Sequence, residues 1–288
     1  MRVRSLVFVT VCVVTAGCAL QAGLPEFKIY NTAFEESKSA SIAIIDMLAV
    51  AERKQWQDSL RGLHSKGYDD KFSPKYASVY SKLADPPLAD VYRRGIDVVA
   101  QYNKVMLVYA TGQGFDTLQA ELSSLGTESA AFLEAAKVGV DVAGKVTPYL
   151  GIAQEVASFA LTVRSRAVFH EEIVKSAPVI RALLVKMRDG TSLVFPRLTY
   201  TTTSELRRLR FGGTAKRAEL LKKLEQMRVL LSDWVILLNR DIDALDAVVL
   251  AAQHPSTAAV LTGTTETIIE LRNATTQIRA HIAEISNS

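Results

Sequence analysis

The sequence predicts an all-α protein, folded as an elongated antiparallel bundle of long helices. Of the 288 residues, 49% are hydrophobic but only 7% are aromatic, and the chain holds just 15 glycines and 8 prolines. Apolar residues recur over long stretches at the three- and four-residue spacing of an amphipathic helix, whereas strand-like alternation is scarce. No fixed period repeats along the chain, which disfavours a solenoid.

The first predicted helix spans residues 25–60. Pro25 suits its first turn, where the missing amide proton costs no hydrogen bond, and the apolar positions that follow have a period near 3.6 residues. Residues 62–87 are rich in glycine, proline and polar residues. They predict a connection that contains a short helix within residues 74–83.

A second long helix is predicted over residues 88–111. Asp85 precedes it as an N-cap, because a carboxylate there accepts hydrogen bonds from first-turn amides. Gly112 follows it, and glycine in a left-handed conformation commonly ends a helix. A third helix is predicted over residues 115–138, and the sequence around residues 125–127 is a place where it can be interrupted. Short connections between such helices favour antiparallel neighbours.

Residues 138–160 form the most apolar stretch after the N-terminal segment. We expect a helix to resume near Pro148 and to continue to about Met187. Pro178 lacks an amide donor and should bend this helix, and Gly190 should close it. Residues 199–203 are β-branched or aromatic, so they form either a short extended segment or part of a helix.

The most regular pattern in the chain is a heptad seam, within a helix predicted over residues 214–252. Its members are spaced alternately by four and three residues, as in a coiled coil, and Asp241 is the one polar member. A last helix is predicted over residues 257–285. The seam consists of Leu220, Leu224, Met227, Leu231, Trp234, Leu238, Asp241, Leu245 and Val248.

The N-terminal residues have the three parts of a secretory signal. Arg2 and Arg4 precede a short uncharged apolar run, which is followed by small residues. The strongly apolar part is about ten residues long, whereas a membrane-spanning helix needs about 20. The sequence Thr15-Ala16-Gly17-Cys18 then resembles the lipobox of bacterial lipoproteins. This resemblance implies cleavage before Cys18 and attachment of lipid, including palmitate, to the new N-terminal cysteine.

The resemblance divides the chain into a signal peptide of residues 1–17, a lipidated tether of residues 18–24 and one helical-bundle domain of residues 25–288. Because Cys12 lies in the signal, Cys18 is the only cysteine of the mature chain, and no intramolecular disulfide is expected. Ala19, rather than aspartate, follows it. By analogy with lipoproteins of Gram-negative bacteria, this residue implies the outer membrane, with the protein facing the periplasm.

The charge balance gives no electrostatic basis for nucleic-acid binding. The whole chain has a formal net charge of +4, and removal of Arg2 and Arg4 with the signal leaves +2. The expected partners are therefore the lipid bilayer, through acylated Cys18, and a protein or cell-wall polymer of the envelope.

A search for catalytic and metal-binding patterns finds none in the sequence, so we expect no enzymatic activity, no cofactor and no metal ion. His170-Glu171-Glu172 begins a zinc-protease motif, but Val174 stands where the second histidine is required. No histidine follows a glutamate by three residues, as in metal–carboxylate bundles.

A cluster of cations around Gly212 and Gly213 is a candidate contact for an anionic ligand. Guanidinium groups bind phosphate or carboxylate through paired hydrogen bonds, as in a lipid headgroup or an acidic cell-wall polymer. The alternative is a solvated helix end, where cations complement the helix dipole. The cluster consists of Arg207, Arg208, Arg210, Lys216 and Arg217.

These observations predict a membrane-anchored, non-enzymatic envelope lipoprotein that acts as a structural or protein-interaction module. The alternative is a membrane-active protein that inserts residues 138–160. Helical pore-forming toxins resemble this layout, since their long helices also surround an apolar hairpin in the middle of the chain.

Overall fold

The computed structural model describes residues 24–64, 73–143, 147–162, 166–209, 214–253 and 258–286. None of these residues lies in a strand, and almost all are helical, which confirms the predicted all-α helical bundle. The elements are α1 (Leu24–His64), a 3-10 turn η1 (Pro74–Tyr76), α2 (Ala77–Tyr80), α3 (Pro87–Ala110), α4 (Phe115–Ala143), α5 (Thr147–Thr162), α6 (Arg166–Asp189), α7 (Thr191–Leu198), α8 (Tyr200–Arg208), α9 (Thr214–Gln253) and α10 (Ala258–Ser286).

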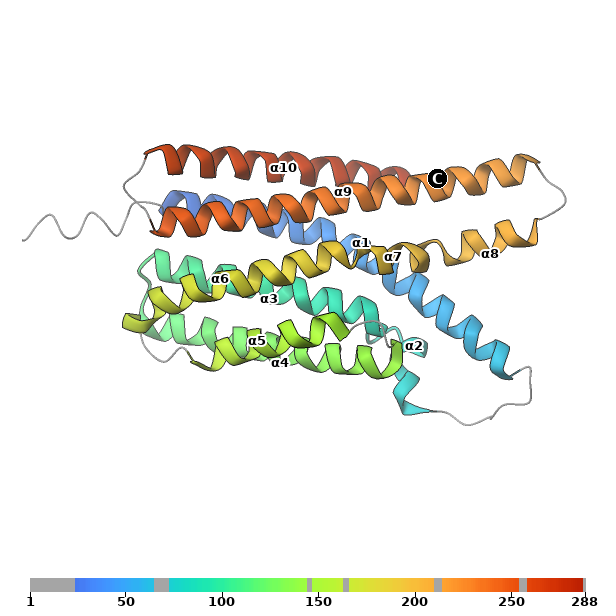
Figure 1. The fold of residues 1–288 in the computed structure, drawn as a ribbon, viewed down its shortest axis with the longest axis horizontal. Helices are drawn as coiled ribbons and strands as arrows, with labels where there is room; N and C mark the ends of the chain where they lie inside the picture. The colour runs from blue at the N-terminus through green and yellow to red at the C-terminus, as the bar shows by residue number, and fades with distance from the viewer. Residues whose placement is uncertain are drawn as a thin grey trace, which may run out of the picture.

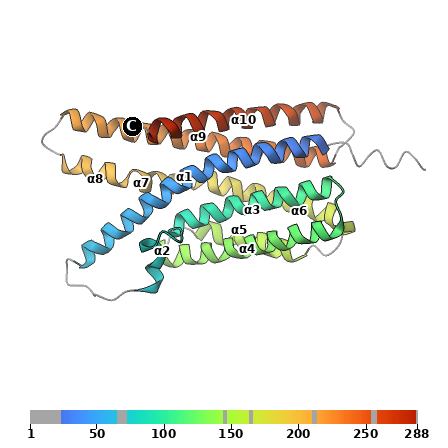
Figure 2. The ribbon, with the colours of Figure 1, turned by 180° about the vertical axis from the view of Figure 1, so that it is seen from behind.

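The long helices lie roughly along the longest axis of the molecule (Figures 1 and 2). α3 packs against α4, and α4 packs against α5, while α9 and α10 form a second extended pair. α1 contacts α3, α9 and α10, and α6 contacts α9 and α5. α1 and α6 therefore join the two groups of helices. Towards its C-terminal end, α1 diverges from α8 and α9 (Figures 1 and 2).

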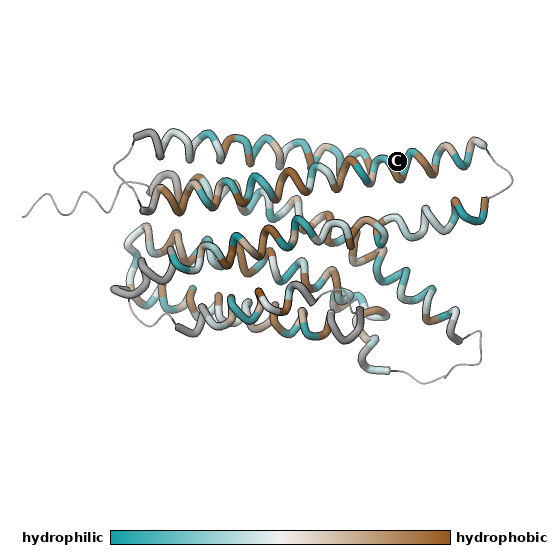
Figure 3. The backbone as a smooth tube through the Cα atoms, viewed as in Figure 1, coloured by the Kyte–Doolittle hydropathy of each residue, from teal (hydrophilic) through white to brown (hydrophobic). Residues whose placement is uncertain are grey.

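The buried apolar side chains form one core cluster, to which each long helix contributes. Hydrophobic and hydrophilic positions alternate along these helices with the spacing of amphipathic helices (Figure 3). The predicted seam of α9 lies in this core: Leu231, Trp234, Leu238 and Leu245 are buried, and so is Asp241. The seam prediction is thus confirmed for these positions.

An aromatic cluster holds four helices together at the centre of the core. The Tyr92 ring of α3 lies 5.4 Å from the Trp234 ring of α9 and 5.8 Å from the Tyr149 ring of α5, measured between centroids. The hydroxyl of Tyr149 donates a hydrogen bond to the carbonyl of Lys186 in α6, at 2.9 Å. A Cβ on Gly190 would lie 2.1 Å from the Tyr149 hydroxyl oxygen, so only glycine fits at the end of α6.

Several predicted boundaries agree closely with the structure. α1, α3, α9 and α10 begin and end within a few residues of the predicted limits. Gly112 has a φ of 64°, which confirms the left-handed helix end. α4 runs without interruption through residues 125–127, where the side chain of Leu125 is fully buried in the core. Residues 200–203 lie in α8, which agrees with the helical one of the two alternatives, and Thr199 forms the turn between α7 and α8.

Other expectations were wrong. The single helix expected from Pro148 to Met187 is divided into α5 and α6, which pack side by side. Their packing allows Tyr149 to bond to Lys186, 37 residues later, which one continuous helix would place far apart. α7 was not predicted as a separate helix. The short helix predicted within residues 74–83 is confirmed, as η1 followed by α2, and it ends at Tyr80.

Candidate functional site

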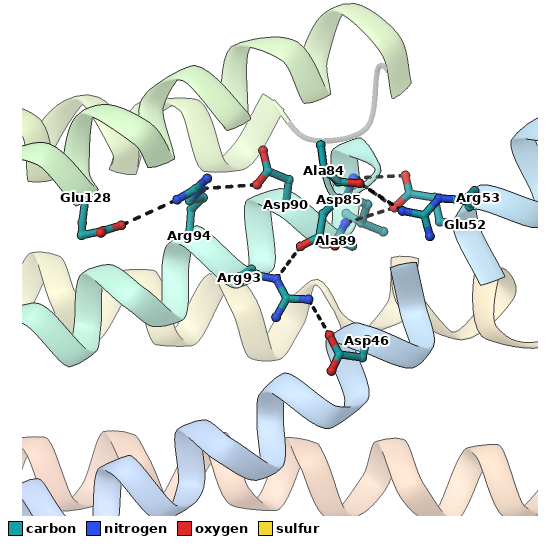
Figure 4. Close-up of polar contacts among 11 residues, drawn as sticks. Asp46, Glu52, Arg53, Ala84, Asp85, Ala89, Asp90, Arg93, Arg94 and Glu128 are labelled. Atoms are coloured by element: carbon teal, nitrogen blue, oxygen red, sulfur yellow. Dashed lines mark hydrogen bonds and ion pairs between the residues drawn. The ribbon is translucent and has the colours of Figure 1, made fainter. Parts of the chain in front are cut away.

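The N-terminus of α3 is capped from another helix. The buried carboxylate of Glu52 in α1 accepts hydrogen bonds from the amides of Leu88 and Ala89, at 3.1 and 3.0 Å (Figure 4). A carboxylate at a helix N-terminus satisfies unpaired amides and interacts favourably with the helix dipole. Burial nevertheless raises the pKa of Glu52, while these two amides act in the opposite direction.

This finding corrects the predicted cap. The N-cap residue of α3 is Pro86, and no side chain of its own segment caps the helix. The carboxylate of Asp85 instead accepts a hydrogen bond from Nε of Arg93, whose Nη2 lies 2.6 Å from Asp46 of α1 (Figure 4). Glu52 is nearer to the first-turn amides because α1 crosses the start of α3, and that crossing leaves Asp85 available to orient Arg93.

Further contacts extend this α1–α3 junction. Arg53 donates a hydrogen bond to the carbonyl of Ala84, at 3.0 Å (Figure 4). Arg94 of α3 lies 3.3 Å from Asp90 and 3.9 Å from Glu128 of α4 (Figure 4). Burial raises the pKa of Asp90, which Arg94 partly offsets. These contacts therefore hold α1 against α3 just before the C-terminal part of α1, which diverges from α8.

A polar cleft of about 420 Å³ lies between the diverging helices. Its α1 wall carries Lys54, Asp58 and Arg61, which are spaced by four and three residues and therefore share one helix face. The residues of its α8 wall also share one helix face, because they follow one another at alternating spacings of one and three residues. This wall consists of Tyr200, Thr201, Ser204, Glu205 and Arg208.

The charges of the cleft do not balance, since three cations face two carboxylates. Asp58 lies 3.8 Å from both Lys54 Nζ and Arg61 Nη1, and all three side chains contact solvent. Long, exposed pairs of this kind contribute little stability. Within the described part of the chain, the Arg208 and Glu205 side chains have no hydrogen bond or ion pair to another residue. The cleft therefore offers charged groups to a ligand.

The structure separates the predicted cluster of cations. Arg208 lines the cleft, whereas its exposed neighbour Arg207 does not. Lys216, in the first turn of α9, lies 3.1 Å from Glu219, and Arg217 is exposed on α9. Arg210 lies outside the described residues. Arg208 thus lines this cleft together with cations from α1.

Sequence reasoning missed the α1 wall. The signal for it was present, because Lys54, Asp58 and Arg61 follow helical spacing at the end of the first predicted helix. A charged helical face is, however, usually solvated, and only the crossing of α1 and α8 shows that it faces a second polar surface. Cys18, the predicted lipidation site, lies outside the described residues.

A second polar contact lies between α9 and α10. Nδ1 of His281 is paired with the carboxylate of Asp233, beside a smaller hollow of about 210 Å³. Among the residues that the structure describes, no group of three or more histidine, cysteine, aspartate or glutamate side chains is arranged to hold a metal ion. This pair connects the two helices.

The apolar stretch 138–160 forms the end of α4 and most of α5. Tyr149, Ile152, Ala153 and Val156 of α5 are buried in the bundle. No helix within the described ranges combines the length and the apolar character needed to cross a bilayer. Comparison of the chain with protein-family models, with curated proteins and with solved structures gave no match.

Proposed function

We propose that this protein is a lipid-anchored, non-enzymatic lipoprotein of the bacterial envelope, which acts as a structural or protein-interaction module. The observation that carries the proposal is the sequence Thr15-Ala16-Gly17-Cys18, placed after a short apolar run and six residues before the start of α1 at Leu24. Acylation of Cys18 with two or more chains provides stable membrane attachment.

The course of α1 supports an interaction role. α1 has 41 residues, and its start and its cleft-lining end lie towards opposite ends of the bundle (Figure 1). At 1.5 Å per residue, the distance along the helix from Leu24 to Asp58 is about 50 Å. A protein anchored close to Leu24 would hold its cleft well away from the anchoring point, towards an envelope protein or cell-wall polymer.

The anchor is tested by expressing the full chain in a Gram-negative host with labelled palmitate. The wild type should incorporate label and sediment with the outer membrane, whereas Cys18→Ala should do neither. Cys12→Ala is the matched control and should be labelled like the wild type, since Cys12 lies in the signal. Equal labelling of Cys18→Ala, or loss of label in Cys12→Ala alone, would contradict the proposal.

The competing function, membrane insertion of residues 138–160, predicts leakage of dye from liposomes. Insertion would remove the buried side chains of Ile152 and Val156 from the core, and that cost argues against it. We therefore expect no leakage from phosphatidylcholine or phosphatidylglycerol liposomes. Leakage by the full chain that is abolished by Ile152→Asp, with unchanged helical circular dichroism, would favour insertion instead.

A further inference from the structure

Core packing does not account for the composition of α8. This helix has nine residues and none of them is buried, whereas the long helices each contribute to the core. Its face towards α1 carries three hydroxyl groups together with Glu205 and Arg208. A short helix gains little stability from its own hydrogen bonds. Its polar face is therefore not explained by packing, and it lines the cleft, where a ligand can reach it.

The two walls of the cleft supply complementary donors. Lys54 and Arg61 reach it from α1, and Arg208 reaches it from α8. The hydroxyls of Tyr200 and Ser204 lie in the same wall as Arg208 and have no hydrogen bond to another side chain within the described ranges. Guanidinium, ammonium and hydroxyl groups that converge from two sides suit an anion with several oxygens in three dimensions.

We propose that the cleft between α1 and α8 binds a phosphate monoester. A tetrahedral phosphate has three terminal oxygens, so it can accept from cations of both walls, from Lys54 or Arg61 on α1 and from Arg208 on α8, whereas a planar carboxylate offers two oxygens. The cleft volume of about 420 Å³ lies within the range of small-molecule sites. Space thus remains for the alcohol part of the ester, and Glu205 can accept a hydrogen bond from its hydroxyls.

This proposal does not depend on lipidation of Cys18, and it is tested with the full chain in a neutral detergent. Glucose 6-phosphate is the soluble probe, titrated by calorimetry, and unphosphorylated glucose is the control probe. Arg208→Gln and Lys54→Gln should each weaken binding by about tenfold, since each removes a charged donor. Arg207→Gln is the matched control, because Arg207 is the exposed neighbour outside the cleft, and it should bind like the wild type.

A lipid can carry the same phosphate group, so a second arm uses vesicles. Binding to phosphatidylcholine vesicles that contain phosphatidate is compared with binding to phosphatidylcholine alone, by flotation of Cys18→Ala. Binding of glucose 6-phosphate assigns a soluble monoester, and binding to phosphatidate vesicles alone assigns a lipid headgroup. In either case Arg208→Gln must lose binding while Arg207→Gln keeps it.

Three results would overturn the proposal: no binding of either probe, equal binding of glucose, or equal losses in Arg207→Gln and Arg208→Gln. Thermal unfolding followed by circular dichroism checks that the variants fold. Because α8 buries none of its residues, Arg208→Gln should unfold at the wild-type temperature. Lys54→Gln provides a separate variant on the opposite wall.

Discussion

The two halves of α1 carry polar residues that have opposite effects on packing. In the N-terminal half, Ser37 and Ser41 are fully buried against α9. Ser37 Oγ lies 2.7 Å from Asp241 Oδ2, and Ser41 Oγ accepts a hydrogen bond from Nε1 of Trp234, at 3.0 Å. In the C-terminal half, the long charged side chains from Lys54 to Arg61 face α8 across an open cleft.

This difference shows how side-chain size and pairing determine the approach of two helices. Small hydroxyls let backbones approach closely and form hydrogen bonds with Trp234 and with one oxygen of Asp241, so the contact excludes water. Lysine and arginine keep their charged ends hydrated, and bringing them into a dry interface is costly. The same helix can thus stabilise the bundle at one end and remain open to a ligand at the other.

The largest effect should follow from removing Trp234, the aromatic residue that contacts the N-terminal half of α1, which we call the closed half. Trp234→Ala leaves a cavity beside Tyr92 and leaves Ser41 without its donor, so the free energy of unfolding should fall by about 3–5 kcal/mol. Urea unfolding measures this change. Ile236→Ala, two residues along α9 and half exposed, is the control and should have a much smaller effect. Similar losses would show that the closed half is not anchored by Trp234.

The pH dependence of stability should identify the buried carboxylate. Burial raises the pKa of Asp241 to about 8 from an ordinary value of 3.8, and the contact with Ser37 partly offsets this. Between pH 3.8 and about pH 8, Asp241 therefore keeps its proton in the folded chain but has lost it in the unfolded chain. The contribution of Asp241 to stability is therefore greatest in acid and falls as the pH rises towards 8, by at most about 1.4 kcal/mol per pH unit.

Asp241→Asn should make the fall in stability between pH 4 and pH 8 clearly smaller, as measured by urea unfolding, because it removes the contribution of Asp241. Asp243→Asn is the control, since Asp243 is exposed and forms a surface pair with Arg240. It should leave the slope intact. An unchanged slope in Asp241→Asn would mean that Asp241 is ionised in the folded protein.

A smaller loss is expected at the junction between the two halves. Glu52→Ala leaves the amides of Leu88 and Ala89 without their acceptor, so the free energy of unfolding should fall by about 2 kcal/mol. Glu205→Ala removes a carboxylate from the cleft and should change stability by less than about 0.5 kcal/mol. Thermal unfolding of both variants compares the two carboxylates directly. Equal losses of stability in Glu52→Ala and Glu205→Ala would contradict the view that the junction stabilises the fold and the cleft does not.

The smallest effect on stability should come from the cleft itself. Ser204→Ala removes a hydroxyl that has no hydrogen bond to another side chain within the described residues, so its unfolding temperature should match that of the wild type. Ser37→Ala is the matched control in the N-terminal half of α1, where Asp241 would lose its 2.7 Å contact with the Ser37 hydroxyl, and it should be clearly destabilised. A larger loss in Ser204→Ala would show that the cleft contributes to stability.

Local spacing predicted the fold well but not the contacts between distant segments. The heptad pattern placed Asp241 on the buried face of α9, yet it carried no information about Ser37, which lies 204 residues away. Asp85 stood in the right position for a cap, but the crossing of α1 brought Glu52 closer to the amides. Arg208 was a candidate anion contact, but its neighbours Lys54 and Arg61 come from another helix. Helix periodicity is local, whereas helix crossings depend on the packing of the whole bundle.

The continuity of α1 has a mechanical consequence. Glu52 and Lys54 lie within one turn of each other on an unbroken helix, and the end of α1 is also held by Gln57, which donates a hydrogen bond to the carbonyl of Val79 in α2 at 3.1 Å. A ligand that draws the two walls together must therefore move α8 towards α1, or bend α1 against its contacts with α2 and α3. The free energy of this movement opposes ligand binding. Weakening the hydrogen bonds of Glu52 would let the cleft close more easily, but it would also destabilise the fold.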